Sequence, residues 1–189
     1  MSGYSFIQRV SQLTTLSPEA QGWLGDHLQT FRFKKNELLL PEHRVCHYLY
    51  FICKGVVGGC YQVKEKEVCN WLAAEGNFAT SYYSFIKRQP SFEIIECYED
   101  CTVEAISYSD LQTMYTQFPE SERAGRLILE EYYALLEERL HSIQFNTAAE
   151  RYAGFAERRP DLVYRAPLGK IATYLGMKAE TLSRIRANK

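Results

Sequence analysis

The residue pattern changes near residue 108, from short strand-like runs to helical periodicity. Between residues 30 and 108, apolar runs rich in aromatic and β-branched side chains are interrupted by turn residues about every 8–12 positions. From residue 109 onward, apolar residues recur at the three- and four-residue spacing of helices. Strands followed by helices, without alternation, predict an α+β chain whose strands form a roll or sandwich.

Helix signals also precede the strands. Ser17 can cap a helix that has Pro18 at its first position. Within the strand region, Gly58 and Gly59 indicate a bulge or a close approach of neighbouring groups to the backbone. We therefore predict a first domain at residues 1–118, in which an N-terminal helix precedes a double-stranded β-helix, or jelly roll.

A long helix is predicted from about residue 120 to residue 145. Leu129, Leu136 and Ile143 recur at intervals of seven and form a short heptad seam. At about 1.5 Å per residue the helix spans nearly 40 Å, which is more than one small domain needs. This length favours pairing with the same helix of a second subunit over packing on its own domain. Residues 119–145 are thus the predicted dimerisation helix of a homodimer.

The charge of the chain is informative only locally. The net charge is -1, so the whole molecule does not attract nucleic acid, and any basic surface must be confined to one region. Lysine and arginine outnumber aspartate and glutamate in the last 40 residues. The C-terminal region is therefore where a polyanion would bind.

Six cysteines form neither a CxxC pair nor a cysteine–histidine cluster at zinc spacing. The N-terminus lacks the features of a signal peptide, and no apolar run approaches the roughly 18 residues of a membrane span. We expect a cytoplasmic protein with no membrane partner and with reduced, mostly buried thiols. A redox role for Cys97 and Cys101 is disfavoured, because their spacing falls at a strand and a turn and gives no reason for them to meet.

Residues 167–186 predict two short helices separated by Gly176. Glycine suits this position because a β-carbon opposes the left-handed turn between closely crossing helices. Leu182 and Ile185 of the second helix face inward. The first helix has one apolar face, formed by Leu168, Ile171, Ala172 and Leu175.

The outer face of the second helix carries chemistry that suits base recognition. The planar fork of Arg184 fits guanine O6 and N7, and Glu180 can accept a hydrogen bond from cytosine N4. Thr181, Lys170 and Lys178 suit phosphate contacts, which position a protein on DNA. The alternative is a plain helical hairpin in which Glu180 and Arg184 form a surface ion pair.

The stretch Ile171-Ala172-x-x-Leu175-Gly176-Met177-x-x-Glu180-Thr181-Leu182-Ser183-Arg184-Ile185 closely resembles the helix-turn-helix of the catabolite activator/fumarate-nitrate regulator (CRP/FNR) superfamily. Tyr48-Leu49-Tyr50-Phe51-Ile52-x-x-Gly55 looks like the roll strand and turn of that superfamily, and Glu75-Gly76-x-Phe78 looks like the start of its ligand cassette. The resemblance covers nearly the whole chain. It implies a helix-turn-helix domain at residues 146–189 and a homodimeric transcriptional regulator of double-stranded DNA, with RNA polymerase as a further partner.

By this resemblance Glu180 and Arg184 match the base-reading positions. Ala179 departs from the best-known members, which have an arginine there, so the base preference should differ at that contact. The predicted DNA-binding residues are Lys170, Lys178, Ala179, Glu180, Thr181, Ser183, Arg184 and Arg186.

The predicted ligand cassette departs from that of the cyclic-nucleotide-binding members. Asn77 replaces the glutamate that holds the ribose, and no cation stands at Pro90-Ser91, where the phosphate-binding arginine is expected. We therefore expect no cAMP or cGMP in the standard mode and no other cofactor, and we leave an unidentified small molecule as the effector. The candidate pocket residues are Gly76, Asn77, Phe78, Arg88 and Ser91. Four aromatic residues near this cassette either line an apolar pocket or belong to the ordinary core: Tyr82, Tyr83, Phe85 and Phe92.

Two other classes of function compete with this one. A ligand-binding sensor that acts on a protein partner without DNA is the alternative to a regulator. An enzyme is not expected, and no catalytic residue is assigned, because no facing set of histidine and carboxylate ligands is visible. No metal ligand is assigned either, since the spacing of the histidines follows no motif: His27, His43, His47 and His141.

Overall fold

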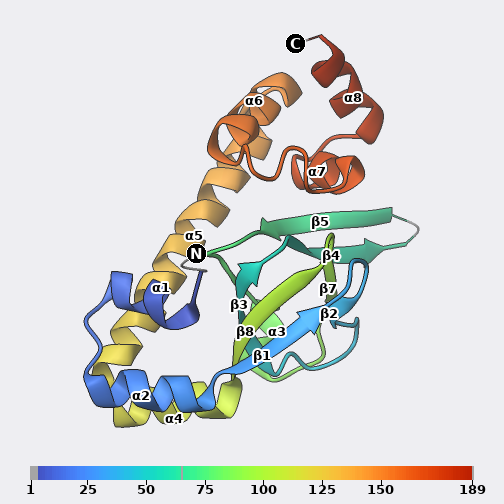
Figure 1. The fold of residues 1–189 in the computed structure, drawn as a ribbon. Coiled ribbons are helices and arrows are strands. Elements are labelled where there is room, and N and C mark those ends of the chain that lie inside the picture. The colour runs from blue at the N-terminus through green and yellow to red at the C-terminus, as the bar shows by residue number, and fades with distance from the viewer. Residues whose placement is uncertain (1–3, 65, 189) are drawn as a thin grey trace.

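A computed structural model describes residues 4–64 and 66–188. Two helices open the described chain, α1 (Phe6–Leu13) and α2 (Pro18–His27). The hydroxyl oxygen of Ser17 accepts a hydrogen bond from the Ala20 amide, and Pro18 begins the helix, which confirms the predicted cap. Both helices pack at the end of the roll opposite the C-terminus (Figure 1).

Two antiparallel four-stranded sheets form the roll, in the orders β1-β8-β3-β6 and β2-β7-β4-β5. Fully buried Ile52, Val103 and Ile95 belong to the core between the sheets, and Phe51 packs from the other face of β3 against Phe6 of α1. This arrangement confirms the predicted jelly roll. The strands are β1 (Gln29–Phe33), β2 (Leu38–Leu40), β3 (Tyr48–Lys54), β4 (Val57–Val63), β5 (Lys66–Ala73), β6 (Phe78–Ala79), β7 (Glu93–Cys97) and β8 (Cys101–Ser107).

Both interpretations of the glycine pair in β4 are confirmed. The register of β4 on β5 shifts between Gly59 and Cys60, which is a bulge. The ring of Tyr98 lies against Gly58 and that of Trp71 against Gly59, so closely that neither position has room for a β-carbon.

Three helices follow the strands or lie between them: α3 (Tyr82–Lys87), α4 (Tyr108–Gln117) and α5 (Pro119–Phe145). Ser107 caps α4, because its hydroxyl oxygen accepts a hydrogen bond from the Asp110 amide. The 27 residues of α5 span about 40 Å at the usual rise, and the helix runs along one side of the molecule from α4 to α6 (Figure 1).

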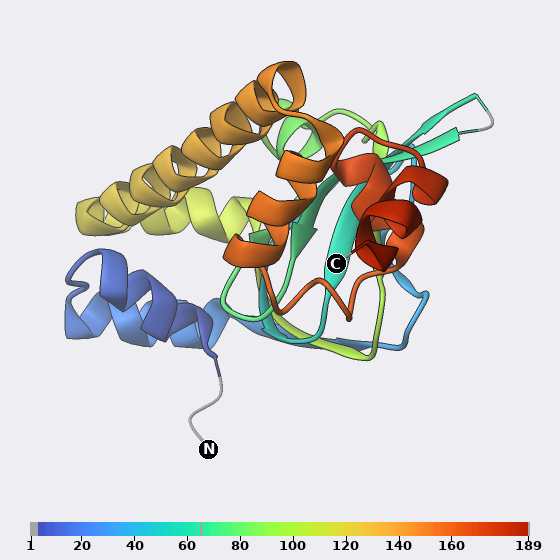
Figure 2. The same cartoon turned by 90° about the horizontal axis from the view of Figure 1, so that it is seen from above.

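The C-terminal region is formed by α6 (Ala148–Arg158), α7 (Leu168–Tyr174) and α8 (Ala179–Ala187). A capping box starts α6, since the Thr147 side chain accepts the Glu150 amide and the Glu150 carboxylate accepts the Thr147 amide. Seen from above, these helices cover the end of the roll that is formed by β4 and β5 (Figure 2). No helix within residues 4–64 and 66–188 is both long and apolar enough to cross a membrane.

A second hydrophobic cluster crosses the predicted boundary between the roll and the C-terminal region. The C-terminal helices pack their own core onto the β4–β5 end of the roll. The roll contributes Val56, Cys60, Cys69, Leu72, Ala74 and Tyr98, and the C-terminal region contributes Tyr152, Phe155, Leu162, Ile171, Ala172 and Leu182, among others.

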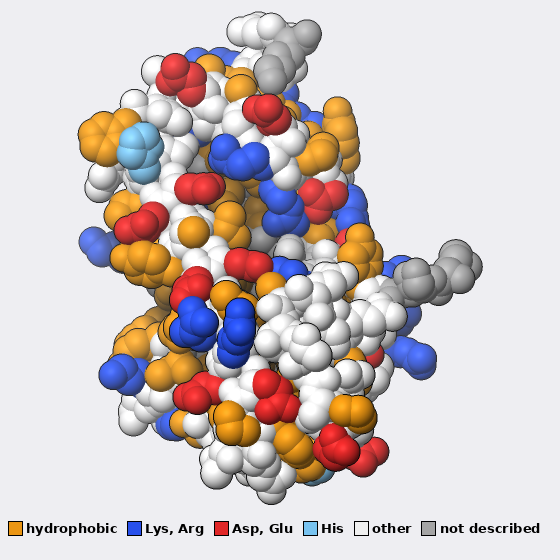
Figure 3. Space-filling model, turned by 90° about the vertical axis from the view of Figure 1, so that its left-hand side faces the viewer, with side chains coloured by type: hydrophobic (Ala, Val, Ile, Leu, Met, Phe, Trp, Pro, Cys, Tyr) orange, Lys and Arg blue, Asp and Glu red, His pale blue; other side chains and the backbone are white. Residues whose placement is uncertain are grey.

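The predicted heptad seam on α5 is divided between two environments. Leu129 and Leu136 are 42% and 52% exposed. Ile143, by contrast, is half-buried and lies beside Gly176 of the C-terminal region. Hydrophobic side chains appear among the charged ones on the side of the molecule along which α5 runs (Figure 3).

We expect Gly55→Ala to destabilise the fold. Gly55 has a φ of +106°, and a β-carbon there would overlap the Cys101 thiol and lie 3.0 Å from the Asp100 carbonyl oxygen. The strain and overpacking should lower the free energy of unfolding by about 2–3 kcal/mol, measured by urea titration. Gly22→Ala is the control, because its β-carbon meets open space on α2 and should be neutral or slightly stabilising. Equal stability of the two variants would contradict the expectation.

Candidate nucleic-acid interface

Two short helices, α7 and α8, meet at a tight turn. Gly176 has a φ of +66°, in the left-handed region that glycine adopts without strain. Its amide donates to the Thr173 carbonyl at 3.0 Å, and the Met177 amide donates to the Ala172 carbonyl at 2.9 Å. These bonds satisfy carbonyls at the end of α7 and turn the chain into α8.

The inner faces of both helices are buried as predicted. Ile171, Ala172 and Leu182 are at most 1% exposed, and Leu168, Met177 and Ile185 pack against the same cluster. The helical pair therefore has one core side and one outer side. The outer side of α8 points away from the roll (Figure 1).

Three predicted base-reading or backbone-contacting residues lie exposed on α8: Glu180, Ser183 and Arg184. Glu180 and Arg184 form no ion pair within the described part of the chain, with each other or with another residue. The surface ion pair of the alternative interpretation is therefore not formed, and both groups are free to bind an external partner.

The other predicted contacts flank this face. Lys178 is exposed as the N-cap residue of α8, while Ala179 and Thr181 are half-buried. Arg186 is also half-buried, with its guanidinium carbon 5.6 Å from the ring centroid of Tyr164. A cation over an aromatic face is held in place while its charge stays available.

Lys170 lies on the opposite side of the helical pair from this face. Its ammonium is 2.5 Å from Glu67 Oε1 and 2.8 Å from Glu96 Oε2, and its side chain is only 17% exposed. Burial works to lower the pKa of Lys170, but the hydrogen bonds to the two carboxylates outweigh it and raise the pKa. In this arrangement Lys170 fastens α7 to the roll and is not presented to a phosphate.

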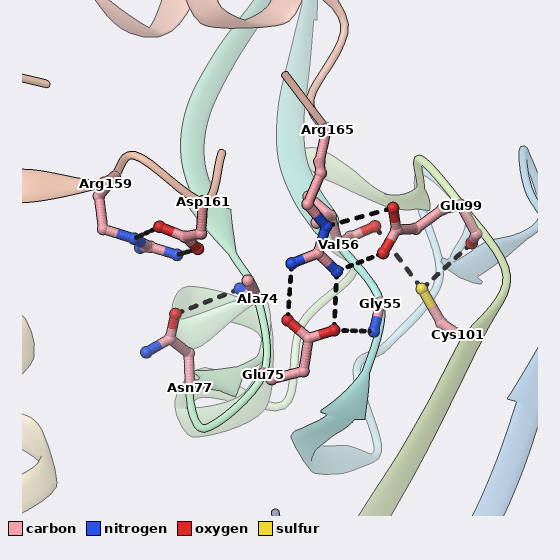
Figure 4. Close-up of polar contacts among 10 residues, drawn as sticks. All are labelled: Gly55, Val56, Ala74, Glu75, Asn77, Glu99, Cys101, Arg159, Asp161 and Arg165. Atoms are coloured by element: carbon pink, nitrogen blue, oxygen red, sulfur yellow. Dashed lines mark hydrogen bonds and ion pairs between the residues drawn. The ribbon is translucent and has the colours of Figure 1, made fainter. Parts of the chain in front are cut away.

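Arg165, which precedes α7, makes a second ionic connection to the roll (Figure 4). It donates two hydrogen bonds to Glu75, at 2.9 and 2.7 Å, and it also pairs with Glu99. The same Glu75 carboxylate accepts the Gly55 amide at 2.8 Å. Sequence spacing does not predict this contact, because Arg165 and Glu75 are 90 residues apart and Glu75 is assigned only to the predicted ligand cassette.

Two further arginines tie the helix-turn-helix to the long helix and to α6. The Arg139 side chain on α5 donates to the Tyr174 carbonyl at 3.2 Å and lies 5.0 Å from the Tyr174 ring centroid. Arg151 on α6 donates to the Leu175 carbonyl at 2.7 Å and to the Asn146 carbonyl at 2.6 Å. The junction of α5 with α6 is thereby bonded to the end of α7.

The predicted effector residues do not converge on one cavity. Gly76 (φ +83°) donates its amide to the Ile52 carbonyl, and the side chain of Asn77 accepts the Ala74 amide (Figure 4). Phe78 is buried against Phe6 and Phe51 in the roll core. The contacts of Gly76 and Asn77 build the turn, whereas Phe78 also lines an apolar cavity between the roll and α3, α4 and α5.

Arg88 and Ser91 are likewise occupied within the fold. Arg88 donates to the carbonyls of Cys46 and Phe85. Ser91 is fully buried, and its hydroxyl bonds to Ser81 and to the Glu93 carbonyl.

An apolar cavity of about 290 Å³ lies instead between α3, α4 and α5. Tyr82 and Phe85 line it, as the apolar-pocket interpretation suggested, together with Phe78 of the roll and residues of α4 and α5. Tyr83 and Phe92 are not among its lining residues and pack on each other, with ring centroids 5.0 Å apart. No group of three or more potential metal ligands occurs within residues 4–64 and 66–188.

No family model and no curated protein sequence matches the chain. Solved structures do match it. FixK2 from Bradyrhizobium japonicum aligns with a TM-score of 0.74 at 19% identity, over 85% of this chain and 83% of that one. A CooA mutant from Carboxydothermus hydrogenoformans aligns with a TM-score of 0.70 at 18% identity, over 97% and 84%.

The catabolite activator protein of Thermus thermophilus aligns with a TM-score of 0.59 at 16% identity, over 95% of this chain and 85% of that one. A putative transcriptional regulator of the CRP/FNR family from Eubacterium rectale aligns with a TM-score of 0.71 at 16% identity, over 92% of this chain and 83% of that one. The chain has their fold, a cyclic-nucleotide-binding-like roll followed by a long helix and a helix-turn-helix.

We expect the Glu75–Arg165 contact to make stability depend on pH. Burial works to raise the pKa of Glu75, but hydrogen bonds from Arg165 and the Gly55 amide outweigh it and hold the pKa near 2, below the ordinary 4.5. A depressed folded-state pKa stabilises the protein above pH 4.5, and this contribution is lost as the pH falls toward 2.

Glu75→Gln should therefore lower the free energy of unfolding at pH 6 by about 1–2 kcal/mol, and the deficit should shrink at pH 3. Urea titrations followed by tryptophan fluorescence at both pH values measure this. Glu157→Gln, at an exposed carboxylate on α6, is the control and should show no such deficit. A deficit for Glu75→Gln that is the same at both pH values would refute this origin of the stability.

Proposed function

We propose that this chain is a dimeric, DNA-binding transcriptional regulator of the CRP/FNR type, with α8 as its recognition helix. The observation that carries the proposal is the outer face of α8, where Glu180, Ser183 and Arg184 are exposed and the two charged groups are unpaired within the described chain. A guanidinium and a carboxylate one helical turn apart can contact neighbouring base pairs in the major groove.

Arg184→Ala should weaken binding to a selected palindromic DNA by about 1–3 kcal/mol, or roughly 5- to 150-fold, and should relax base preference at one position of each half-site. Binding to selected DNA libraries at several salt concentrations measures both effects. Arg32→Ala is the charge-matched control, since Arg32 is exposed on β1 at the far end of the roll. If wild-type protein enriches no sequence at any salt concentration, the regulator proposal fails.

The exposed face of α5 supports the dimer. Large apolar side chains on a helix surface are usually covered by a partner. Two parallel α5 helices would bury these side chains together and place the two recognition helices in successive major grooves about 34 Å apart. The exposed residues on this face are Leu129, Tyr132, Tyr133, Leu136 and Leu140, whereas the exposed Leu135 and Phe145 lie on other sides of the helix.

Leu136→Glu should convert the dimer to a monomer, because it places a charge in the apolar interface. Sedimentation velocity at micromolar concentration measures the change. Leu38→Glu is the matched control, since Leu38 on β2 is also partly exposed, at 39%, and lies in the roll. A Leu136→Glu variant that remains dimeric would exclude α5 as the interface.

The cassette residues do not fit a cyclic phosphate. Ser91 is buried and its hydroxyl is already hydrogen-bonded within the fold. The nearby carboxyl group of Glu93 is only 5% exposed and accepts the Trp71 indole N–H at 3.0 Å. Burial raises the pKa of Glu93. A buried carboxyl group and the lack of a cation at Pro90-Ser91 both oppose an anionic ligand. We retain an unidentified effector of another chemical class.

The remaining roles follow from the proposed class. We propose no catalytic function, and RNA polymerase stays the proposed partner at promoters. The competing hypothesis, a sensor that acts on a protein partner without DNA, requires that substitutions at Glu180 and Arg184 leave the function unchanged. The library experiment therefore also separates these two classes.

A further inference from the structure

The hairpin of β4 and β5 brings two cysteines opposite each other. Cys60 pairs with Cys69 in the antiparallel register, just after the bulge at Gly59. Directly paired residues project from the same face of a sheet, and their α-carbons are about 4.5–5.5 Å apart. Disulfides form across α-carbon separations of about 4.4–6.8 Å. The backbone therefore already has the spacing of a disulfide, although both thiols are free.

Cys60 and Cys69 have different polar neighbours. The Tyr98 hydroxyl lies 3.3 Å from Cys60 Sγ, and the Lys170 ammonium of α7 lies 3.9 Å from the same sulfur. Cys69 bonds to α7 through its backbone, since its amide donates to the Thr173 hydroxyl oxygen at 3.0 Å. Both cysteines are fully buried in the cluster that joins the roll to the helix-turn-helix.

The two thiols differ in acidity as a consequence. A hydrogen bond from Cys69 lowers the pKa of Cys60, against the effect of burial, and Tyr98 and Lys170 lower it further. The hydrogen bond to Cys60, together with burial, raises the pKa of Cys69 well above its usual range. Cys60 is thus the sulfur that ionises first, and Cys69 keeps its proton. A nucleophilic thiolate beside a resolving thiol is the arrangement found in redox-active pairs.

We propose that Cys60 and Cys69 are a redox-active dithiol, which a hydroperoxide converts to an intrachain disulfide when α7 separates from β5. The Cys60 thiolate attacks the terminal peroxide oxygen, the O–O bond breaks, and the alkoxide that leaves takes up a proton to become an alcohol. The Cys60 sulfenic acid then reacts with the Cys69 thiol, forming the S–S bond and releasing water. Two thiols lose two electrons and two protons, and the hydroperoxide is reduced.

The requirement for separation follows from burial. Neither sulfur is accessible while α7 covers the hairpin, and α7 is held there by the Lys170 ion pairs and the Thr173 hydrogen bond. A hydroperoxide can reach Cys60 only when these contacts open. The rate of the proposed reaction therefore measures how often α7 separates from the roll, and the proposal does not require that the protein bind DNA.

The chain contains a second thiol pair that serves as an internal comparison. We predicted that Cys97 and Cys101 do not meet, and this is wrong. They lie at facing ends of β7 and β8, and their mutual hydrogen bond is the largest influence on the pKa of each. The charged groups with the largest influence on these two pKa values are carboxylates of the described chain, among them Glu99 and Glu37.

The experiment treats the full-length reduced protein with cumene hydroperoxide at neutral pH, quenches with an alkylating reagent, and maps tryptic peptides. Cys60 and Cys69 fall in the separate peptides 55–64 and 67–87, whereas Cys97 and Cys101 share the peptide 89–123. We expect the first two peptides to become cross-linked and to be released by dithiothreitol. This should occur several-fold faster than oxidation of the Cys97–Cys101 pair, because the Tyr98 hydroxyl lies beside Cys60, whereas the carboxylate of Glu99 opposes a thiolate at Cys101.

Two variants test the assigned roles. Cys69→Ser should stop the reaction at a Cys60 sulfenic acid that dimedone traps. Thr173→Val removes the bond to the Cys69 amide but leaves both thiols and Lys170, so it should speed the cross-link several-fold. The proposal is overturned if wild-type Cys60 and Cys69 stay fully alkylatable, if the Cys97–Cys101 pair oxidises first, or if Thr173→Val leaves the rate unchanged.

Discussion

The docking of α7 onto β5 is the contact on which the rest of the arrangement depends. Fully buried Ile171 and Ala172 meet the roll at Cys69 and Leu72. Burial of these apolar groups provides the favourable free energy, because ion pairs at partly exposed positions contribute little by themselves. The Arg165 and Lys170 clusters have a different role. Each cation sits between two carboxylates of the roll, so a shifted or rotated α7 would leave charges unpaired.

This docking decides what the outer surface of the molecule offers. Since one face of the helix-turn-helix is occupied by the roll, the opposite face carries the free charges of α8. The long helix shows the same division, with Ile143 turned toward the C-terminal region and Leu136 toward solvent. Side chains that contact the roll or the C-terminal core therefore stabilise the fold, and those on the opposite faces remain accessible to solvent.

The sequence predicted those features that depend on local spacing. The Ser17 cap, the strand block, the long helix and the turn at Gly176 each follow from periodicity or from the conformational freedom of one residue. It did not predict which neighbour a charged side chain finds. Lys170 lies next to the apolar face of α7, and spacing alone cannot tell whether the roll or a phosphate meets it.

The thiol pairs show the same limit more sharply. Glycines in β4 predicted a bulge, but the partner of Cys60 depends on where the bulge falls. A slip of one residue would turn the side chain to the other face of the sheet. Similarly, the meeting of Cys97 and Cys101 depends on the tight turn by which the chain passes from β7 in one sheet to β8 in the other, which their spacing along the chain does not reveal.

Arg139 and Arg151 have a mechanical consequence. Through them, the end of α5 and the start of α6 are both clamped to backbone carbonyls at the close of α7. These hydrogen bonds join α5, α6 and α7 into one unit, so a rotation of α5 about its own axis would move α7, and α8 after it, in the same direction. A force that rotates α5 would thus move the exposed face of α8 relative to the roll without any change inside the three-helix unit.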